Sequence, residues 1–188
     1  MAYVCRYRMV IDLRRVELPE PNLKPGYFFV AWNSDLISRH AWVKYKSFQG
    51  EIDSYVFRCL GERLGCEQLM QNIAARENFL PQATWLVCYR SPETGEVTDC
   101  GTIQGVGPES DGVGAIQNVG VVPEHRRQGI GRALLLKSLA GFREAGLFRV
   151  CLDVTASNEP AVLLYQSLGF RLLRTSYRKL EVDFSEST

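Results

Sequence analysis

Apolar and polar positions alternate over two short stretches near the start of the chain. Residues 6–12 alternate loosely and predict a strand. Residues 27–31 are rich in aromatic and β-branched side chains, which also favours a strand. Three prolines and a glycine fall between these stretches, so residues 13–26 predict an irregular connection.

Helical spacing follows over three segments. Apolar residues recur every three or four positions within residues 37–48, 52–64 and 66–74, which predicts three amphipathic helices. Their expected boundaries are a cap at Ser34 or Asp35, breaks at Gly50 and Gly65, and a stop at Pro81.

Beyond residue 82, strand and helix patterns alternate. Strands are expected at residues 83–90, 97–106, 115–122, 148–154 and 170–182, and helices at residues 130–145 and 160–168. This order predicts an α/β fold of the α+β kind, with helices on a mixed sheet of seven or slightly more strands. No internal repeat or linker divides the sequence, so we expect one domain over residues 27–184, preceded by an N-terminal extension over residues 1–26.

Composition favours a globular domain and excludes several other classes. Of the 188 residues, 46% are hydrophobic and 23% are charged, which argues against disorder, collagen and coiled coil. The net charge is +1 and neither half is strongly basic, so a nucleic-acid partner is not expected. No apolar run approaches the ~18 residues of a membrane span, so membrane association is not expected either.

The cysteines favour neither a zinc site nor a disulfide framework. None of the six forms a C-x-x-C pair, and only His40 and His125 could join them as ligands, so no metal is expected. Arg6 and Arg8 interrupt the apolar N-terminal stretch, which is unlike a signal peptide. We therefore expect a cytoplasmic protein with reduced thiols.

A glycine-rich turn with arginines is the most informative stretch. The strand expected at residues 115–122 leads into a loop with Arg126 and Arg127, and Gly129 and Gly131 then open the next helix. Glycines let a ligand approach the backbone, and a helix N-terminus carries about half a positive charge, so this arrangement suits an anion. The arginines can add forked hydrogen bonds to a phosphate.

Several phosphate motifs compete for this turn. A nucleoside-triphosphate loop needs G-x-x-x-x-G-K-S/T, which does not occur in the sequence. A dinucleotide fingerprint, G-x-G-x-x-G/A, fits the two glycines and finds an acid at Asp153, but Leu134 takes its third small position. A pyrophosphate loop of the form R/Q-x-x-G-x-G matches residues 126–131, and a plain strand-to-helix turn with solvated arginines is the remaining alternative.

A second motif lies downstream of the turn. Residues 158–170 follow the pattern N-x-x-A-x-x-L-Y-x-x-x-G-F. At this spacing, the turn and this segment together resemble the paired motifs of the GNAT N-acetyltransferase superfamily. The resemblance is close over residues 115–170, looser over residues 83–106 and weak before residue 80. Within the superfamily the chain is similar to bacterial single-domain members, among them the ribosomal-protein N-terminal acetyltransferases.

The resemblance implies an acyl-CoA N-acyltransferase fold that binds acetyl-CoA, uses no metal and acetylates an amine. Residues 27–82 would form acceptor-side helices, and residues 83–184 a CoA-binding sheet. In the family, the fourth strand splays away from the fifth, and pantetheine lies in the gap. Backbone groups of Val119 and Val121 would pair with pantetheine, with Gly120 allowing close approach or a bulge. The other implied cofactor-binding residues are Arg126, Arg127, Gln128, Gly129, Ile130, Gly131 and Arg132 around the pyrophosphate, and Asn158, which would bond to pantetheine or cap its helix.

Tyr165 matches the family tyrosine that faces the CoA sulfur. A phenol with a pKa of about 10 can protonate a departing thiolate, whereas without the motif Tyr165 would be a core aromatic. The ribosomal-protein enzymes carry an acid at the position of Asp153, so Asp153 is the expected general base, or else a strand-end carboxylate that bonds to a turn. The alternative bases are Glu109, Asp111 and Asp99, while His40 is expected to be structural and His125 to pack or contact phosphate.

The sequence does not identify the acceptor. Residues 27–57 are rich in aromatic side chains, which would fill the core or else line a pocket for an apolar amine. Transfer to a ribosomal protein is not inferred. The alternative functions are a non-catalytic acyl-CoA-binding sensor or scaffold and a nicotinamide-dependent enzyme that uses the dinucleotide fingerprint. Base rates for soluble oligomers are compatible with a homodimer.

Overall fold

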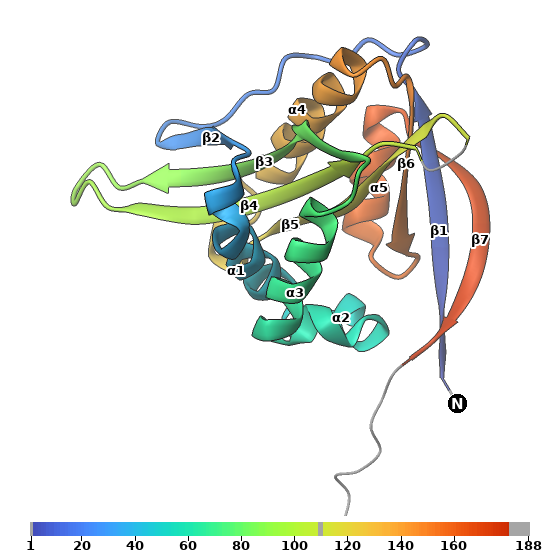
Figure 1. The fold of residues 1–188 in the computed structure, drawn as a ribbon, viewed down its shortest axis with the longest axis horizontal. Coiled ribbons are helices and arrows are strands. Elements are labelled where there is room, and N and C mark those ends of the chain that lie inside the picture. The colour runs from blue at the N-terminus through green and yellow to red at the C-terminus, as the bar shows by residue number, and fades with distance from the viewer. Residues whose placement is uncertain (1, 109–110, 181–188) are drawn as a thin grey trace, which may run out of the picture.

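One sheet with helices on both faces forms the architecture (Figure 1). The computed structural model describes residues 2–108 and 111–180. Its strands are β1 (Tyr3–Asp12), β2 (Tyr27–Ala31), β3 (Phe79–Arg90), β4 (Val97–Val106), β5 (Val113–Val121), β6 (Arg149–Thr155) and β7 (Arg171–Lys179). Its helices are α1 (Ile37–Phe48), α2 (Ile52–Val56), α3 (Arg63–Ala74), α4 (Ile130–Glu144) and α5 (Glu159–Leu168), with 3-10 turns η1 (Ser34–Leu36), η2 (Arg58–Gly61) and η3 (Pro123–His125).

The strands pair in the order β2-β3-β4-β5-β6-β1-β7. Neighbours run antiparallel except for β5 and β6, which are parallel. The predicted fold class, a mixed sheet of seven strands with helices on its faces, is confirmed.

The N-terminal strand lies inside the sheet rather than beside it. β1 pairs with β6 on one side and with β7 on the other, as the blue strand at the right of Figure 1 shows. Met9 and Ile11 are almost fully buried in the core, and alternation puts Arg6 and Arg8 on the opposite face of the strand. The predicted extension, residues 1–26, therefore contributes an inner strand. The predicted boundary at residue 184 lies outside the described residues.

Two predicted helix boundaries are wrong. Gly65 lies inside α3, where the missing side chain lets the helix approach the backbone of Cys59. Pro81 lies within β3, at a register irregularity between Leu80 and Trp85, which is where a strand tolerates a residue without an N–H. Helix packing and strand pairing therefore override the local breaker signals.

The helical segment after β2 is also more irregular than predicted. The helix expected over residues 52–64 consists of the short α2 followed by η2. The side chain of Asn33, not that of Ser34 or Asp35, caps the first turn, since it accepts from the N–H of Asp35. The other predicted elements lie close to their expected positions.

Helices cover both faces of the sheet. α1 packs on β4 and β5 and α3 packs on α1, while α4 packs on β3, β4 and β5 from the opposite face. The core beneath α4 is apolar and includes Ile103, Leu134 and Phe142. None of the helices in the described part of the chain is long and apolar enough to cross a membrane.

A bulge in β5 decides which side chains face which layer. Pairing with β4 shifts by one residue there, which leaves Gln117 as an extra residue on β5. Beyond the bulge, Asn118 and Gly120 face α1, and a Cβ added at Gly120 would lie 2.7 Å from the Cβ of Ser47. Gly120 therefore permits the close approach of α1, and the bulge lies at Gln117.

Candidate active site

β5 and β6 diverge and leave an open gap in the sheet. They pair only over Val113–Ala115 against Arg149–Cys151. Beyond that point β5 stays paired with β4, and β6 stays paired with β1. The facing edges, residues 116–121 and 152–155, are therefore not joined by a ladder. The strand splay implied by the family resemblance is present.

The backbone of β5 points hydrogen-bonding groups into this gap. The N–H of Val122 donates to the carbonyl of Cys100 on β4. Because successive residues of a strand turn their backbone groups to opposite edges, Val121 and Val119 turn theirs toward β6. The Nε of Arg126 reaches the carbonyl oxygen of Val121 at 3.1 Å. This geometry is compatible with the predicted role of the two valines.

The glycine-rich loop presents backbone amides at the N-terminus of α4. Gly129 has a φ of 82° and Arg127 a φ of 62°, and the second value is strained for a residue with a side chain. The first intrahelical bond runs from Ala133 to Gly129, so the amides of residues 130–132 have no partner within the helix. Ile130 is buried, so only its backbone is available to a ligand. The loop is suited to an anion.

Arg126 does not extend toward a ligand. Its Nη1 lies 2.7 Å from Glu51 Oε1, and its Nη2 donates to the carbonyl of Ser47 at 2.9 Å. With the bond to Val121, these contacts tie the loop to the helical layer. The guanidinium of Arg126 is thus engaged within the protein in this structure, and its phosphate contact stays a prediction.

The other loop side chains are placed differently from one another. Gln128 Oε1 accepts from Lys24 Nζ at 2.9 Å, and Arg132 Nη1 donates to Ser167 Oγ at 3.1 Å. Arg127 is exposed and makes no ion pair or side-chain hydrogen bond within the described residues. Arg127 is therefore the loop cation with the most freedom to contact a phosphate.

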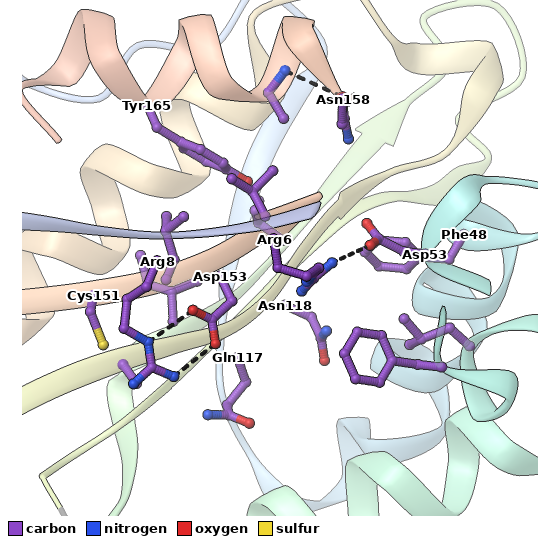
Figure 2. A pocket seen from close by; sticks show the side chains of 18 of the residues that line it. Arg6, Arg8, Phe48, Asp53, Gln117, Asn118, Cys151, Asp153, Asn158 and Tyr165 are labelled. Carbon is purple, nitrogen blue, oxygen red and sulfur yellow. Dashed lines mark hydrogen bonds and ion pairs between the residues drawn. The ribbon is translucent and has the colours of Figure 1, made fainter. Parts of the chain in front are cut away.

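A cavity of about 380 Å³ continues from the gap toward the helical layer (Figure 2). Residues 115–119 of β5 and 151–154 of β6 line one side of it. Asn158, Ala161 and Tyr165 approach from α5 and its cap. The remaining lining residues belong to β1, β7 and the helical layer from the end of α1 through α3.

Tyr165 reaches the cavity from α5. The residue is 7% exposed and its ring packs against Phe170, with centroids 5.9 Å apart. Within the described residues its hydroxyl has no hydrogen-bond partner. The oxygen is not fully buried, and Tyr165 lines the cavity, so the hydroxyl faces the cavity. Burial raises the pKa of Tyr165, and the charge of Asp53 raises it further, so the phenol stays protonated at neutral pH. Asn158 caps α5 by accepting from the N–H of Ala161 at 3.3 Å.

Asp153 also lines the cavity, but an arginine holds its carboxylate. Nε and Nη2 of Arg8 lie 2.9 and 2.8 Å from its two oxygens, as Figure 2 shows. Burial alone would raise the pKa of Asp153, but the hydrogen bonds and charge of Arg8 outweigh burial and lower the pKa. A carboxylate with a lowered pKa is a weak base, so these surroundings do not favour Asp153 as the proton acceptor.

The two alternative bases that the structure describes, Asp99 and Asp111, do not line the cavity. Asp99 on β4 bonds to Arg39 at 2.6 and 3.0 Å and accepts from the thiol of Cys88. Asp111 is exposed in the loop before β5. Glu109 lies outside the described residues. None of the carboxylates predicted as alternatives is therefore placed in the cavity by the described structure.

Both histidines occupy packed positions. His40 is fully buried with its Nδ1 2.8 Å from Thr102 Oγ1, and burial, together with the charge of Lys44, lowers the pKa of His40 to about 3. The Nδ1 of His125 lies 2.8 Å from the hydroxyl of Tyr27. Neither ring lines the cavity.

A buried polar cluster lies between α1 and the sheet, next to the cavity. Lys44 is completely buried, and its Nζ donates to Gln104 Oε1 at 2.5 Å and to Asn118 Oδ1 at 2.6 Å. Gln104 in turn donates to Thr102 at 2.6 Å. Burial lowers the pKa of Lys44 to about 7. Because Asn118 lines the cavity, this cluster supports its wall.

Several charged cavity residues were not expected from the sequence. Arg6, Asp53 and Arg178 come from β1, α2 and β7, which lie outside the two motifs. The sequence gives one indication of these charges, because Arg6 and Arg8 interrupt an otherwise apolar strand. Of the aromatic-rich stretch, Phe48 and Phe57 line the cavity, while the others pack in hydrophobic clusters or lie at the surface. The cavity is therefore more charged than a pocket for an apolar amine would be.

Comparison with known proteins agrees with this geometry. A model of the acetyltransferase (GNAT) family matches residues 59–170, which is more than half of the chain. Among solved structures, a GCN5-related N-acetyltransferase from Sphaerobacter thermophilus superimposes with a TM-score of 0.68 at 23% identity, over 98% of this chain and 55% of that one. Identity this low supports the fold alone.

Two curated relatives match a shorter stretch. A mycothiol acetyltransferase of Thermobispora bispora is 52% identical over 58 residues, which is 31% of this chain and 20% of that protein. A ribosomal-protein-bS18-alanine N-acetyltransferase of Escherichia coli is 45% identical over 53 residues, which is 28% of this chain and 36% of that protein. The matched stretch thus covers well under half of either relative.

Proposed function

This chain belongs to the acetyltransferase (GNAT) family, and on that basis we propose that it transfers an acetyl group from acetyl-CoA to the amine of an acceptor. The observation that carries the proposal is the gap between β5 and β6. The end of β5 at Val121 lies beside the anion-binding start of α4, and residues 115–119 line a cavity with a buried tyrosine. A phosphate site and a reaction site are thereby joined along one strand.

The phosphates of the donor would lie against the start of α4. The backbone amides of residues 130–132 supply donors, and the exposed Arg127 supplies charge. Arg132 adds a second cation at the same helix end, while Arg126 holds the loop in position. This donor set fits a pyrophosphate, which needs several N–H groups and positive charge at close range.

The pantetheine arm would add to the free edge of β5. An extended chain with amide groups pairs with such an edge as another strand would. Val119 and Val121 turn their backbone groups to this edge. An N–H group of this edge would also stabilise the negative charge that develops on the thioester oxygen during attack.

Acetyl-CoA supplies a thioester, whose carbonyl carbon the neutral acceptor amine attacks. The new C–N bond forms as the C–S bond breaks, and Tyr165 donates its phenolic proton to the departing sulfur. The raised pKa of Tyr165 means that the phenol carries its proton at neutral pH, so the proton is present when the sulfur departs. The proton lost by the amine passes to solvent in the cavity, and the phenol is reprotonated from solvent.

Asp153, the base expected from the family resemblance, has a different place in this proposal. The ion pair with Arg8 keeps the carboxylate of Asp153 charged, and both of its oxygens accept hydrogen bonds from Arg8. The acceptor amine releases its proton to solvent in the cavity before it attacks, so this step needs no carboxylate base. We therefore assign Asp153 to shaping the cavity wall together with Arg8.

We propose a cytoplasmic location from the state of the cysteines. All six are free thiols in the structure. Free thiols without a disulfide framework are usual in a reducing compartment.

The test combines binding with turnover. Calorimetric titration with acetyl-CoA, CoA and NAD is expected to show binding of the two CoA species and no binding of NAD. Release of CoA, followed with a thiol reagent, is then measured against a panel of amines. Acetyl-CoA binding without turnover of any amine would favour the sensor or scaffold alternative. Binding of NAD in place of CoA would reject the proposal.

A further inference from the structure

The cavity holds more charge than an uncharged thioester requires. The guanidinium groups of Arg6, Arg8 and Arg178 and the carboxylates of Asp53 and Asp153 line it. All other lining residues are uncharged. Three positive groups against two negative ones leave a formal charge of +1 on the lining.

The two carboxylates are engaged differently (Figure 2). Asp153 uses both oxygens for Arg8. Asp53 uses one oxygen, Oδ1, which lies 2.6 Å from Arg6 Nη1 and 2.7 Å from Thr155 Oγ1. Within the described residues the second oxygen of Asp53 has no hydrogen-bond partner. It is not fully buried, so it is open to the cavity. Asp53 can therefore bind a cation that enters the cavity.

Arg178 is the cavity cation that no carboxylate neutralises within the described residues. Its guanidinium carbon lies 4.4 Å from the centroid of the Phe57 ring, and that of Arg6 lies 5.1 Å from the same centroid. An aromatic face attracts a guanidinium but takes up none of its conventional hydrogen bonds. The N–H groups of Arg178 therefore stay available to an anion.

Phe57 links the open carboxylate to the available guanidinium. Its backbone N–H donates to the carbonyl of Asp53 at 2.8 Å, so α2 fixes the two residues together. The Phe57 ring lies beside Arg178. The Arg6–Asp53 pair and Arg178 thus both lie next to the apolar ring of Phe57, and a short aliphatic chain could lie along that ring.

We infer that the acceptor is a zwitterionic amine, whose ammonium group is bound by the open oxygen of Asp53 and whose carboxylate is bound by Arg178. This inference rests on the proposed function and names its acceptor class. A planar guanidinium donates two parallel hydrogen bonds to a carboxylate, which suits this anion. An amine without an anionic group would add its charge to a cavity that is already positive, so it would bind less well.

The experiment uses ω-amino acids of increasing chain length to measure the distance between the charges of Asp53 and Arg178. Acceptors from glycine to 6-aminohexanoate are each paired with the corresponding carboxamide, which keeps the amine and removes the anion. The expected result is a preferred chain length at which kcat/KM for the carboxylate exceeds that for the carboxamide roughly 10- to 100-fold. Arg178→Gln is expected to bring this ratio close to one. Arg171→Gln, an exposed arginine at the other end of β7, should preserve the ratio.

Other outcomes would overturn the inference. The wild-type enzyme could use carboxylate and carboxamide equally well, or Arg178→Gln could retain the preference for the carboxylate. Either result would mean that Arg178 does not bind the carboxylate of the acceptor, although the proposed function stands. If acetyl-CoA binds but no amine is acetylated, the proposed function fails for such amines. Calorimetric titration of the same pairs then tests the inference alone, and equal affinities for carboxylate and carboxamide would reject it.

Discussion

The Nζ of Lys44 lies 2.6 Å from the side-chain oxygen of Asn118, although the lysine is completely buried and the asparagine lines the cavity. This contact occupies the oxygen of Asn118, so its NH₂ group is left for the cavity. Lys44, on α1, thereby orients a residue that lines the cavity. A buried amine is costly to ionise, which links this orientation to pH.

Replacing Lys44 by methionine is expected to change how stability depends on pH. Burial lowers the pKa of Lys44 from 10.5 to about 7, so between these values the unfolded chain binds a proton that the folded protein does not. The lysine therefore costs more stability as pH falls through this window, by about 1.4 kcal/mol per pH unit, and the cost is constant below it.

Urea titrations at pH 7, 8 and 9 check this prediction. The wild type should gain stability relative to Lys44→Met by about 1.4 kcal/mol for each unit of rising pH. Lys46→Met, in the same helix but at a position that is not buried, should show no such gain. Parallel curves for the wild type and Lys44→Met would mean that the buried amine titrates normally.

Tyr165→Phe is expected to reduce kcat by roughly 10²- to 10⁴-fold, the usual contribution of a general acid. The phenyl ring keeps the contact with Phe170, so the melting temperature and acetyl-CoA affinity should stay near their wild-type values. Tyr177→Phe, on the exposed strand β7, serves as the matched control. Stopped-flow or steady-state CoA release measures the effect, and a kcat unchanged in Tyr165→Phe would remove the phenol from the mechanism.

Gly131→Ala should separate stability from donor binding. A Cβ at Gly131 would lie 3.6 Å from Leu164, an ordinary contact, and alanine stabilises a helix interior by up to ~1 kcal/mol over glycine. The same methyl group would lie 3.9 Å from the side chain of Val121, beside the strand edge proposed to bind pantetheine, so the Kd for acetyl-CoA should rise about tenfold, or ~1.4 kcal/mol.

The opposite behaviour is expected of Gly141→Ala in the same helix. An added Cβ there would clash with the backbone carbonyl of Gln82, so thermal stability should fall. Calorimetry with acetyl-CoA and thermal melts of both variants distinguish the two cases. Unchanged acetyl-CoA affinity in Gly131→Ala would mean that this glycine serves the fold and not the ligand.

The pH profile of turnover tests the assignment of Asp153. Because the pKa of Asp153 is lowered, its carboxylate stays charged throughout the range from pH 6 to pH 9. Over that range kcat/KM should follow deprotonation of the acceptor amine and rise about tenfold per pH unit below the amine pKa. Asp153→Asn should give a parallel profile. A break in the wild-type profile that disappears in Asp153→Asn would restore Asp153 as the base.

The proposed donor site could be located in the sequence because its information is local. The glycines before α4 and the segment of residues 158–170 carry their function in adjacent positions, and the structure places them at the ends of neighbouring elements. Side-chain direction was less predictable. The composition of the loop favoured a phosphate contact for Arg126, but Glu51, 75 residues earlier, competes for its guanidinium.

The acceptor half was not predictable because it depends on pairing between distant segments. The alternation of apolar and polar residues over positions 6–12 predicted a strand, but nothing in that stretch indicates which strands pair with it. Arg8 meets a carboxylate 145 positions away, and Arg6 meets one 47 positions away. Contacts of this kind follow from strand order, which a single sequence specifies only through the whole folded core.

The inner position of β1 sets an order of events during synthesis. β1 emerges first, but its partners β6 and β7 begin at Arg149 and Arg171. At about 5–20 residues per second the strand waits on the order of ten seconds for them, with the apolar side chains of Met9 and Ile11 uncovered. Insertion of β1 is thus a late, long-range step of folding. A chain that stalls before this step would hold a donor site without the arginines of its acceptor site.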